Sequence, residues 1–200
     1  MTQLFTDDYI SEFLVGQAIR SVTSKSGFQS RGGLINLCDP ACGAGHILAS
    51  AVRLFLREFP HSSACTLRVH GFDIDPHAIE LCRLVVFLEY VRAGRVEECP
   101  EIWADLTRTI TLLEGPCGTL DRGQIASEQT YDVLIANPPY LGRRKLSSVM
   151  RSYLDRYYPV AAVDLCAAFM QRCIELTSLG GAIGFVTTDK WLRLAGYEGL

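Results

Sequence analysis

The 200-residue chain lacks an excess of basic residues, and it lacks any apolar run long enough to cross a bilayer. It holds 19 lysines and arginines against 22 aspartates and glutamates, which gives a net charge of -3. This balance excludes a uniformly basic coat for nucleic acid, so any such contact must come from a local patch. With 48% hydrophobic and 20% charged residues, the composition is that of a folded domain. We expect one cytoplasmic domain over 1–200, without membrane contact.

Paired cysteine motifs are also missing, although the chain has eight cysteines. Cys38 and Cys42 are close in sequence, but no second pair follows at the spacing of a zinc site. Others lie inside apolar runs, as Cys82 and Cys166 do. We interpret the cysteines as reduced, mostly buried thiols and predict no metal site.

The chain alternates between predicted strands and predicted helices. Short apolar runs predict strands at 34–38, 66–74, 101–104, 131–136 and 182–187. Helical spacing of apolar residues predicts helices at 5–20, 46–59, 76–91 and 162–178, with Gly180 and Gly181 ending the last one. A polar connection at 106–130 and a basic segment at 143–156 lie between them, and another helix is expected from Lys190. This alternation is typical of an α/β fold with a parallel sheet and helices on both faces.

Glycines follow the first predicted strand, in the pattern Gly43-x-Gly45. This pattern alone is weak, because a dinucleotide-binding turn needs a third small residue where Leu48 stands. Such a turn also expects an acid about 20 residues later, whereas Asp73 lies 28 residues beyond Gly45. A pyrophosphate site is therefore disfavoured.

Three aspartates lie at the predicted strand ends, where open α/β sheets bind their ligands. Asp39 follows the first strand, Asp73 ends the second and Asp105 follows the third. S-adenosylmethionine carries no phosphate and needs acids for its amino group and its ribose, which Asp39 and Asp73 offer. The structural alternatives are a helix cap for Asp39, a solvated strand end for Asp73 and a loop start for Asp105.

The segment Asn137-Pro138-Pro139-Tyr140 follows the fourth predicted strand. Its two prolines fix the backbone and leave carbonyls without neighbouring N–H donors. Adenine N6 is a poor nucleophile, and acceptance of both N6 hydrogens by the Asn137 side chain and the Pro138 carbonyl would free its lone pair. Tyr140 can stack on the base, which must be flipped out of the duplex. Transfer is then a direct in-line displacement. The alternative is a plain β-turn with a surface tyrosine.

Basic residues follow this turn, and they are Arg143, Arg144, Lys145, Arg151 and Arg156. They can hold DNA phosphates near the flipped base. A solvated helix face explains them equally well.

Five segments resemble motifs of the γ-type N6-adenine DNA methyltransferases, and they occur in the motif order of that type. They are 4–10, 36–48, 71–76, 104–105 and 136–140. Segments 137–146, 164–169 and 180–191 look most like the adenine methyltransferases of BREX phage-defence systems and of fused restriction–methylation enzymes. The resemblance implies a Rossmann-like S-adenosylmethionine-dependent methyltransferase with strand order 3-2-1-4-5 for the part present. It also implies that the final strands and a target-recognition domain are missing here.

The same resemblance implies roles for individual residues. Thr6 would contact the methionine part of S-adenosylmethionine, Asp39 its amino group and Asp73 its ribose, while Asp105 and Leu106 would contact its adenine. The full expected cofactor-binding set is Thr6, Asp39, Ala41, Gly43, Gly45, Asp73, Ile74, Asp105 and Leu106. Expected partners are double-stranded DNA with an adenine-containing site and proteins of a defence system.

Two alternatives to an adenine DNA methyltransferase remain open. Enzymes that methylate the amide of a protein glutamine share Asn-Pro-Pro-Tyr, but they begin with a helical substrate domain. Here only about thirty residues precede the first predicted strand. The other alternative is a truncated remnant that binds S-adenosylmethionine without turnover.

Overall fold

Five parallel strands form one sheet in the computed structural model, which describes residues 6–25, 33–59, 65–125 and 128–188. The strands are β1 (Leu34–Asp39), β2 (Thr66–Asp73), β3 (Ile110–Leu112), β4 (Tyr131–Ala136) and β5 (Thr177–Phe185). Their order is β3-β2-β1-β4-β5, which confirms the predicted order 3-2-1-4-5 and the α/β class. The expected helix from Lys190 and the Leu4-Phe5 part of the first motif lie outside the described residues.

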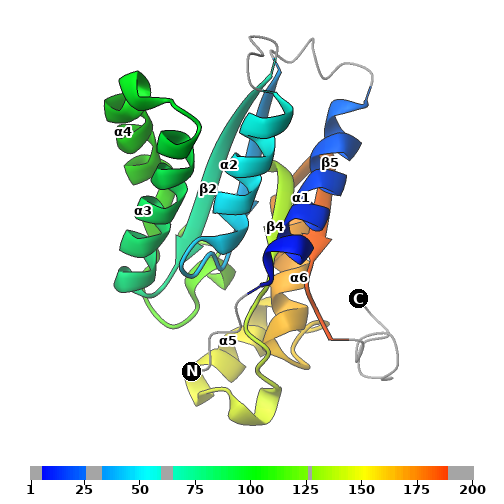
Figure 1. The fold of residues 1–200 in the computed structure, drawn as a ribbon. Coiled ribbons are helices and arrows are strands. Elements are labelled where there is room, and N and C mark those ends of the chain that lie inside the picture. The colour runs from blue at the N-terminus through cyan, green and yellow to red at the C-terminus, as the bar shows by residue number, and fades with distance from the viewer. Residues whose placement is uncertain (1–5, 26–32, 60–64, 126–127, 189–200) are drawn as a thin grey trace.

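Helices cover both faces of the sheet (Figure 1). One face carries α1 (Asp8–Thr23), α2 (His46–Glu58) and α3 (Pro76–Arg92), and the other carries α6 (Leu165–Leu176). Side chains alternate between the faces along a strand, so Leu37 packs in the core under α1 to α3, whereas Cys38 packs with Cys173 of α6. Because all the strand pairs are parallel, the carboxyl ends of the strands lie at one edge of the sheet.

The third strand was predicted at 101–104, and this prediction is wrong. Residues Cys99–Thr109 form helix α4, and β3 follows it at Ile110–Leu112. Pro100 stands in the first turn with Glu101, and both residues favour a helix start. Ile102 and Leu106 lie four residues apart and pack on the core as one helical face.

The last predicted helix ends earlier than expected, and its glycines have another role. Helix α6 stops at Leu176, and Gly180 and Gly181 lie inside strand β5. The register with β4 shifts at this place, and Gly180 has a φ of 81°. A glycine with positive φ is a common device for a β-bulge. The glycines therefore bend a strand rather than end a helix.

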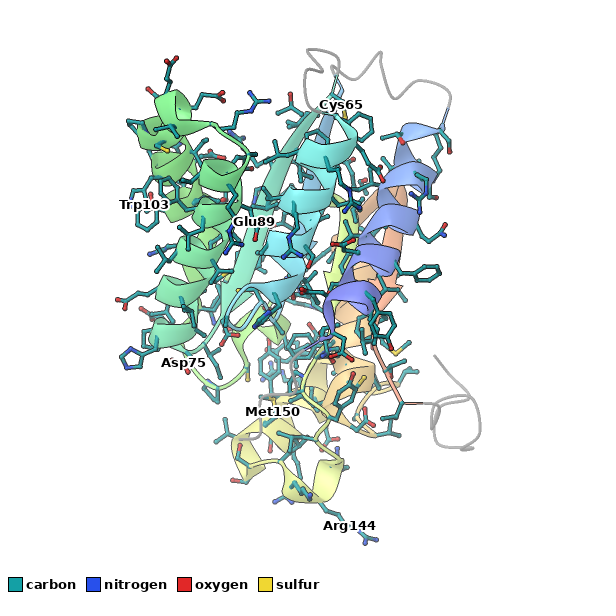
Figure 2. The ribbon with its side chains drawn as sticks, viewed as in Figure 1. Cys65, Asp75, Glu89, Trp103, Arg144 and Met150 are labelled. Carbon is teal, nitrogen blue, oxygen red and sulfur yellow. The ribbon has the colours of Figure 1, made fainter. Side chains whose placement is uncertain are left out.

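After the Asn-Pro-Pro-Tyr turn, the chain leaves the carboxyl edge of the sheet at Gly142 and returns at Asp164. We call this segment, which includes the basic residues, the excursion. It contains the 3-10 helix η4 (Arg143–Lys145) and helix α5 (Ser148–Tyr157). Its two ends meet in an antiparallel bridge between Gly142 and Asp164. Met150 and Leu154 pack with Phe169 in a small core of their own, and Met150 is labelled in Figure 2. No helix among the described residues is long and apolar enough to cross a membrane.

Candidate functional site

Asp39 lies at the end of β1 with its carboxylate buried, at 1% exposure. Burial is the largest cause that raises its pKa, to about 7 from an ordinary 3.8. The backbone N–H of Ala41 donates to Oδ1 at 3.0 Å and lowers the pKa, while the neighbouring Asp73 raises it. A buried carboxyl that titrates near neutrality is stabilised in its charged form by a cation, and such groups mark functional sites.

Asp73 holds the loop after β1 in place. Its Oδ2 accepts the backbone N–H of Gly43 at 2.9 Å, and its Oδ1 accepts that of Asp75 at 2.9 Å. The N–H of Cys42 also donates to the carbonyl of Phe72 at 3.0 Å. Each carboxylate oxygen can accept a second hydrogen bond, so Asp73 can also accept from a ribose hydroxyl. The loop and the end of β2 thus form one unit.

The two glycines of this loop serve the packing of the chain itself. Gly45 has a φ of 87°, and a Cβ there would lie 2.9 Å from the Cα of Cys82 in α3. Gly43 has a φ of 50°. Both conformations favour glycine. The glycines are required by the close approach of α2 and α3 and by the turn, which explains them without a pyrophosphate.

Asp105 and Leu106 are not at a strand end, contrary to the sequence prediction. Both belong to α4, where Asp105 pairs with Arg68 at 3.1 Å and Leu106 is 3% exposed in the core. Arg68 stands five residues before Asp73 on β2, which is about 16 Å along a strand. The predicted adenine contact through these two residues is therefore wrong, because its basis was the misplaced third strand.

A wall of the site that the sequence did not reveal is the segment after β3. The Thr119 hydroxyl donates to the carbonyl of Pro40, in the loop that follows Asp39. Arg172, 4% exposed in α6, donates to the carbonyls of Thr119 at 3.1 Å and Ile125 at 3.4 Å. The available signal was an arginine inside a mostly apolar helix, since a buried charge needs partners.

The Asn137-Pro138-Pro139-Tyr140 turn follows β4 at the same edge of the sheet. The Nδ2 of Asn137 donates to the Thr6 hydroxyl at 2.9 Å, and the Tyr140 hydroxyl lies 2.5 Å from Asn137 Oδ1. The same hydroxyl lies 2.7 Å from the carbonyl of Val186, just past β5. Burial raises the pKa of Tyr140 to about 12, so its hydroxyl keeps its proton at neutral pH. The turn is therefore a neutral network, tied to the start of α1 and to the end of β5.

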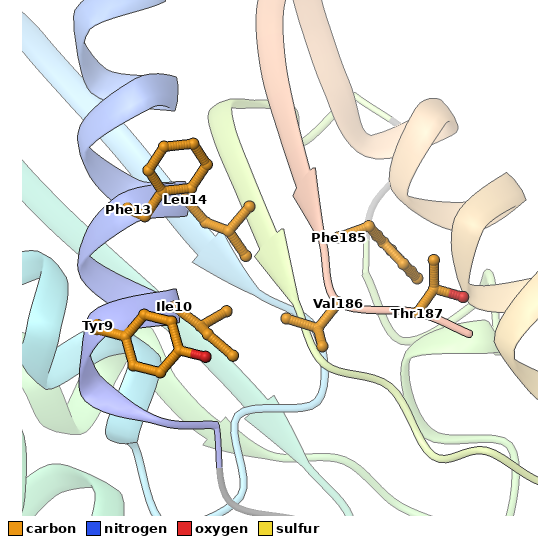
Figure 3. A pocket seen from close by; sticks show the side chains of 7 residues that line it. All are labelled: Tyr9, Ile10, Phe13, Leu14, Phe185, Val186 and Thr187. Carbon is orange, nitrogen blue, oxygen red and sulfur yellow. The ribbon is translucent and has the colours of Figure 1, made fainter. Parts of the chain in front are cut away.

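An open apolar groove of about 540 Å³ lies beside this network, between the first half of α1 and the end of β5 (Figure 3). It is lined by Tyr9, Ile10, Phe13, Leu14, Phe185, Val186 and Thr187. Tyr9 and Phe13 are 72% and 61% exposed. The groove shares Val186 with the Tyr140 hydrogen bond.

The first three basic residues after the turn fall into two groups. Arg143 pairs with Asp155 at 2.7 Å and donates to the carbonyl of Ala162 at 3.1 Å, so it holds the excursion together. Arg144 and Lys145 are exposed, and Figure 2 shows Arg144 pointing away from the molecule at the far end of the excursion. Within the part of the chain that the structure describes, no group of three or more His, Cys, Asp or Glu side chains could hold a metal ion.

Comparison with known proteins gives a family match and several longer relatives. The family model described as Eco57I restriction-modification methylase matches residues 68–200. The adenine-specific methyltransferase PglX of Lacticaseibacillus casei (strain Zhang) is 33% identical over 78 residues, which are 39% of this chain and 6% of PglX. The Type II methyltransferase M.VspI of Vibrio sp. (strain 343) is 27% identical over 165 residues, 82% of this chain and 34% of M.VspI. The chain thus spans about a third or less of these relatives.

Solved structures show the same fold. The ATP-dependent Type ISP restriction-modification enzyme LlaBIII, bound to DNA, matches 100% of this chain and 15% of its own, with a TM-score of 0.69 and 14% identity. A Listeria monocytogenes protein described as a class I S-adenosylmethionine-dependent methyltransferase matches 98% of this chain and 52% of its own, with a TM-score of 0.60 and 16% identity. The fold is therefore that of the S-adenosylmethionine-dependent methyltransferases.

Proposed function

Because the chain belongs to the Eco57I restriction-modification methylase family, we propose that residues 1–200 form a catalytic domain that methylates N6 of a flipped-out adenine in DNA, with S-adenosylmethionine as donor. The observation that carries this proposal is the neutral Asn137 amide at the end of β4, on the same sheet edge as the buried Asp39. We place the activity in a restriction–modification or phage-defence system, with defence proteins as its partners.

The residues at the ends of β1 and β2 fit S-adenosylmethionine. Asp39 is buried with a raised pKa, so a cationic amino group beside it would favour its charged form. Asp73 can accept from the ribose hydroxyls while it holds the Gly43 loop. Ile74, 48% exposed next to Asp73, offers an apolar surface to the adenine ring. When bound, S-adenosylmethionine supplies a methyl group on a positively charged sulfur.

The acceptor side prepares the amino group for attack. Asn137 Oδ1 and the Pro138 carbonyl would accept the two N6 hydrogens, so that the nitrogen lone pair is directed at the methyl group. As the N–C bond forms, the S–C bond would break to leave a neutral thioether, and one N6 proton would leave past these acceptors to solvent. The Tyr140 ring stacks on the flipped base, which contributes about 1–3 kcal/mol. The amide and the hydroxyls of this network are uncharged, so they do not favour a protonated or a deprotonated form of the base. Positioning and exclusion of water then account for the rate.

DNA as the partner is supported by the exposed Arg144 and Lys145 beside the turn. They can contact phosphates on either side of the flipped base, and such contacts position a protein on DNA without reading its sequence. LlaBIII, which has the same fold, is described as bound to DNA.

The test is the Asn137→Ala variant of the full-length protein. We expect methyl transfer to adenine-containing DNA to fall by about 10³-fold or more, since removal of a hydrogen-bonding group used in the transition state costs about 10²–10³ and this acceptor is central. Affinity for S-adenosylmethionine should stay within a few fold by calorimetry. Transfer at the wild-type rate would overturn the role of Asn137. Label found on protein glutamine instead of DNA would favour a glutamine methyltransferase.

A further inference from the structure

Thr6 and Asn137 are hydrogen-bonded although they are 131 positions apart in the chain. The Asn137 Nδ2 donates to the Thr6 hydroxyl at 2.9 Å. Thr6 is only 9% exposed, so its hydroxyl is buried at this contact. A polar group from the very start of the described chain therefore belongs to the acceptor turn.

The two ends of the Asn137 amide have different partners. Its nitrogen meets Thr6, and its oxygen meets the Tyr140 hydroxyl at 2.5 Å. The terminal torsion of an asparagine is broad and roughly two-fold, so the side chain itself does not decide which end is the oxygen. The two hydroxyls fix the plane of the amide, and in the observed orientation its oxygen lies on the side of Tyr140.

The position of Thr6 is itself fixed by helix α1. Only Asp7 separates it from the helix start at Asp8, and α1 packs its buried face, which includes Val15 and Ile19, into the main core. A shift of α1 would move the Thr6 hydroxyl with it. The start of α1 is thus mechanically linked to the end of β4.

We propose that Thr6 is a positioning residue for methyl transfer, whose hydroxyl holds the Asn137 amide with its oxygen directed to the acceptor amine. The proposal rests on the proposed function of the Asn137 turn. It differs from the role implied by the family resemblance, in which Thr6 contacts the methionine part of S-adenosylmethionine. Thr6 would act through Asn137 rather than on either substrate.

The Tyr140 hydroxyl can release the Asn137 oxygen when an acceptor amine binds to it. It has one hydrogen and lies within 2.7 Å of two acceptors, Asn137 Oδ1 and the carbonyl of Val186. When an amine donates to Asn137 Oδ1, the hydroxyl hydrogen can turn to Val186 without movement of the ring. Thr6 keeps the nitrogen end in place during this exchange.

Two variants of Thr6 test the proposal. Thr6→Val keeps the shape of the side chain and removes the hydroxyl, whereas Thr6→Ser keeps the hydroxyl. We expect Thr6→Val to slow single-turnover methyl transfer by about 10–100-fold, since small misplacements of a reacting group cost up to about 10²-fold. Its affinity for S-adenosylmethionine should stay within about 3-fold by calorimetry, and KM for the cofactor should not rise. Thr6→Ser should restore most of the rate.

A spectroscopic readout keeps the test independent of activity. The side-chain amide signals of Asn137 can be identified in a nitrogen-15 NMR spectrum by their loss in Asn137→Ala. We expect them to shift and to exchange faster with water in Thr6→Val, and to stay close to wild type in Thr6→Ser. Unchanged signals in Thr6→Val would overturn the proposal.

The remaining outcomes separate the inference from the proposed function. A wild-type protein that never methylates adenine in DNA contradicts the proposed function, while the Asn137 amide signals still decide the role of Thr6. An active wild type with an unchanged transfer rate in Thr6→Val contradicts the inference alone. A loss of cofactor affinity of about 10-fold or more in Thr6→Val, with normal transfer at saturating cofactor, would return Thr6 to the cofactor site.

Discussion

The proposed cofactor side and the proposed acceptor side of the site lie at one edge of the sheet, but they consist of different kinds of polar group. The ends of β1 and β2 carry two carboxylates, Asp39 and Asp73, and both accept hydrogen bonds from backbone N–H groups. At the ends of β4 and β5, the Asn137 amide meets the hydroxyl of Tyr140 and that of Thr6, which stands just before α1. Charge and backbone define the first side, and neutral side chains define the second.

This difference separates binding from chemistry. A buried carboxylate interacts strongly with a cation, so changes on the cofactor side should appear in affinity and should depend on pH. Neutral hydrogen bonds fix direction and distance, so changes on the acceptor side should appear in the transfer rate and should be insensitive to pH. The predictions below test this separation.

The largest expected effect on the cofactor side comes from Asp39→Asn. The variant loses the charge that we propose faces the cofactor's amino group, and a hydrogen bond to a charged group contributes about 1.5–3 kcal/mol, or about 10- to 150-fold in affinity. Calorimetry with S-adenosylmethionine measures this directly. The transfer rate at saturating cofactor should change far less.

Asp105→Asn is the matched control, because Asp105 was expected to contact the cofactor and lies in α4 instead. Its ion pairs with Arg68 and Arg108 are surface pairs, which contribute about 0–1 kcal/mol at most. Cofactor affinity should therefore stay at the wild-type value. A loss equal to that of Asp39→Asn would show that α4 is part of the cofactor site after all.

The next effect is the pH dependence of cofactor binding. Because the pKa of Asp39 is raised to about 7, the protein without cofactor holds a proton there below neutral pH, and a bound cation must displace it. Affinity for S-adenosylmethionine should rise by about tenfold per pH unit at most as pH increases toward 7, and then level off. Asp39→Asn should remove this dependence. A flat wild-type profile between pH 5.5 and 8 would contradict it.

The sign of the stability change is fixed by the same pKa. The folded chain keeps the Asp39 proton between 3.8, the ordinary value, and about 7, whereas the unfolded chain has released it. The free energy of unfolding without cofactor should therefore fall as pH rises through this window, as far as Asp39 contributes.

On the acceptor side, Tyr140 with a pKa of about 12 stays protonated, so transfer from bound cofactor should be flat from pH 6 to 9.

The sequence predicted the ends of β1 and β2 well, because the local signals there are strong. Asp39 and Asp73 each end an apolar run that is long enough to be a strand, and the following glycines and Pro76 mark a turn and a helix start. These signals lie within a few residues of the site. They required no knowledge of distant contacts.

The prediction of a strand at 101–104 failed because a short apolar run is compatible with both the helical period and the strand period. Ile102 and Trp103 form a run of only two large residues, which a strand and a helix accommodate equally. Pro100 and Glu101 both favour a helix start, and the structure has a helix at this place. The bond between Thr6 and Asn137 could not be predicted either, since no local pattern links residues so far apart, and it depends on how α1 packs on the sheet.

The smallest expected effect concerns the basic excursion beside the acceptor side. Arg144→Ala and Lys145→Ala should each weaken DNA binding by a few fold and reduce the salt slope of log affinity by about 0.9, since each removes one phosphate contact. Arg143→Ala is the matched comparison. Its side chain is already paired with Asp155 and Ala162, so its loss should loosen the excursion and leave the salt slope unchanged. Titration of DNA affinity against salt measures both quantities. If Arg143→Ala lowers the slope while Arg144→Ala does not, the division of the excursion into a structural and a DNA-facing arginine is wrong, and the ion pair with Asp155 must open when DNA binds.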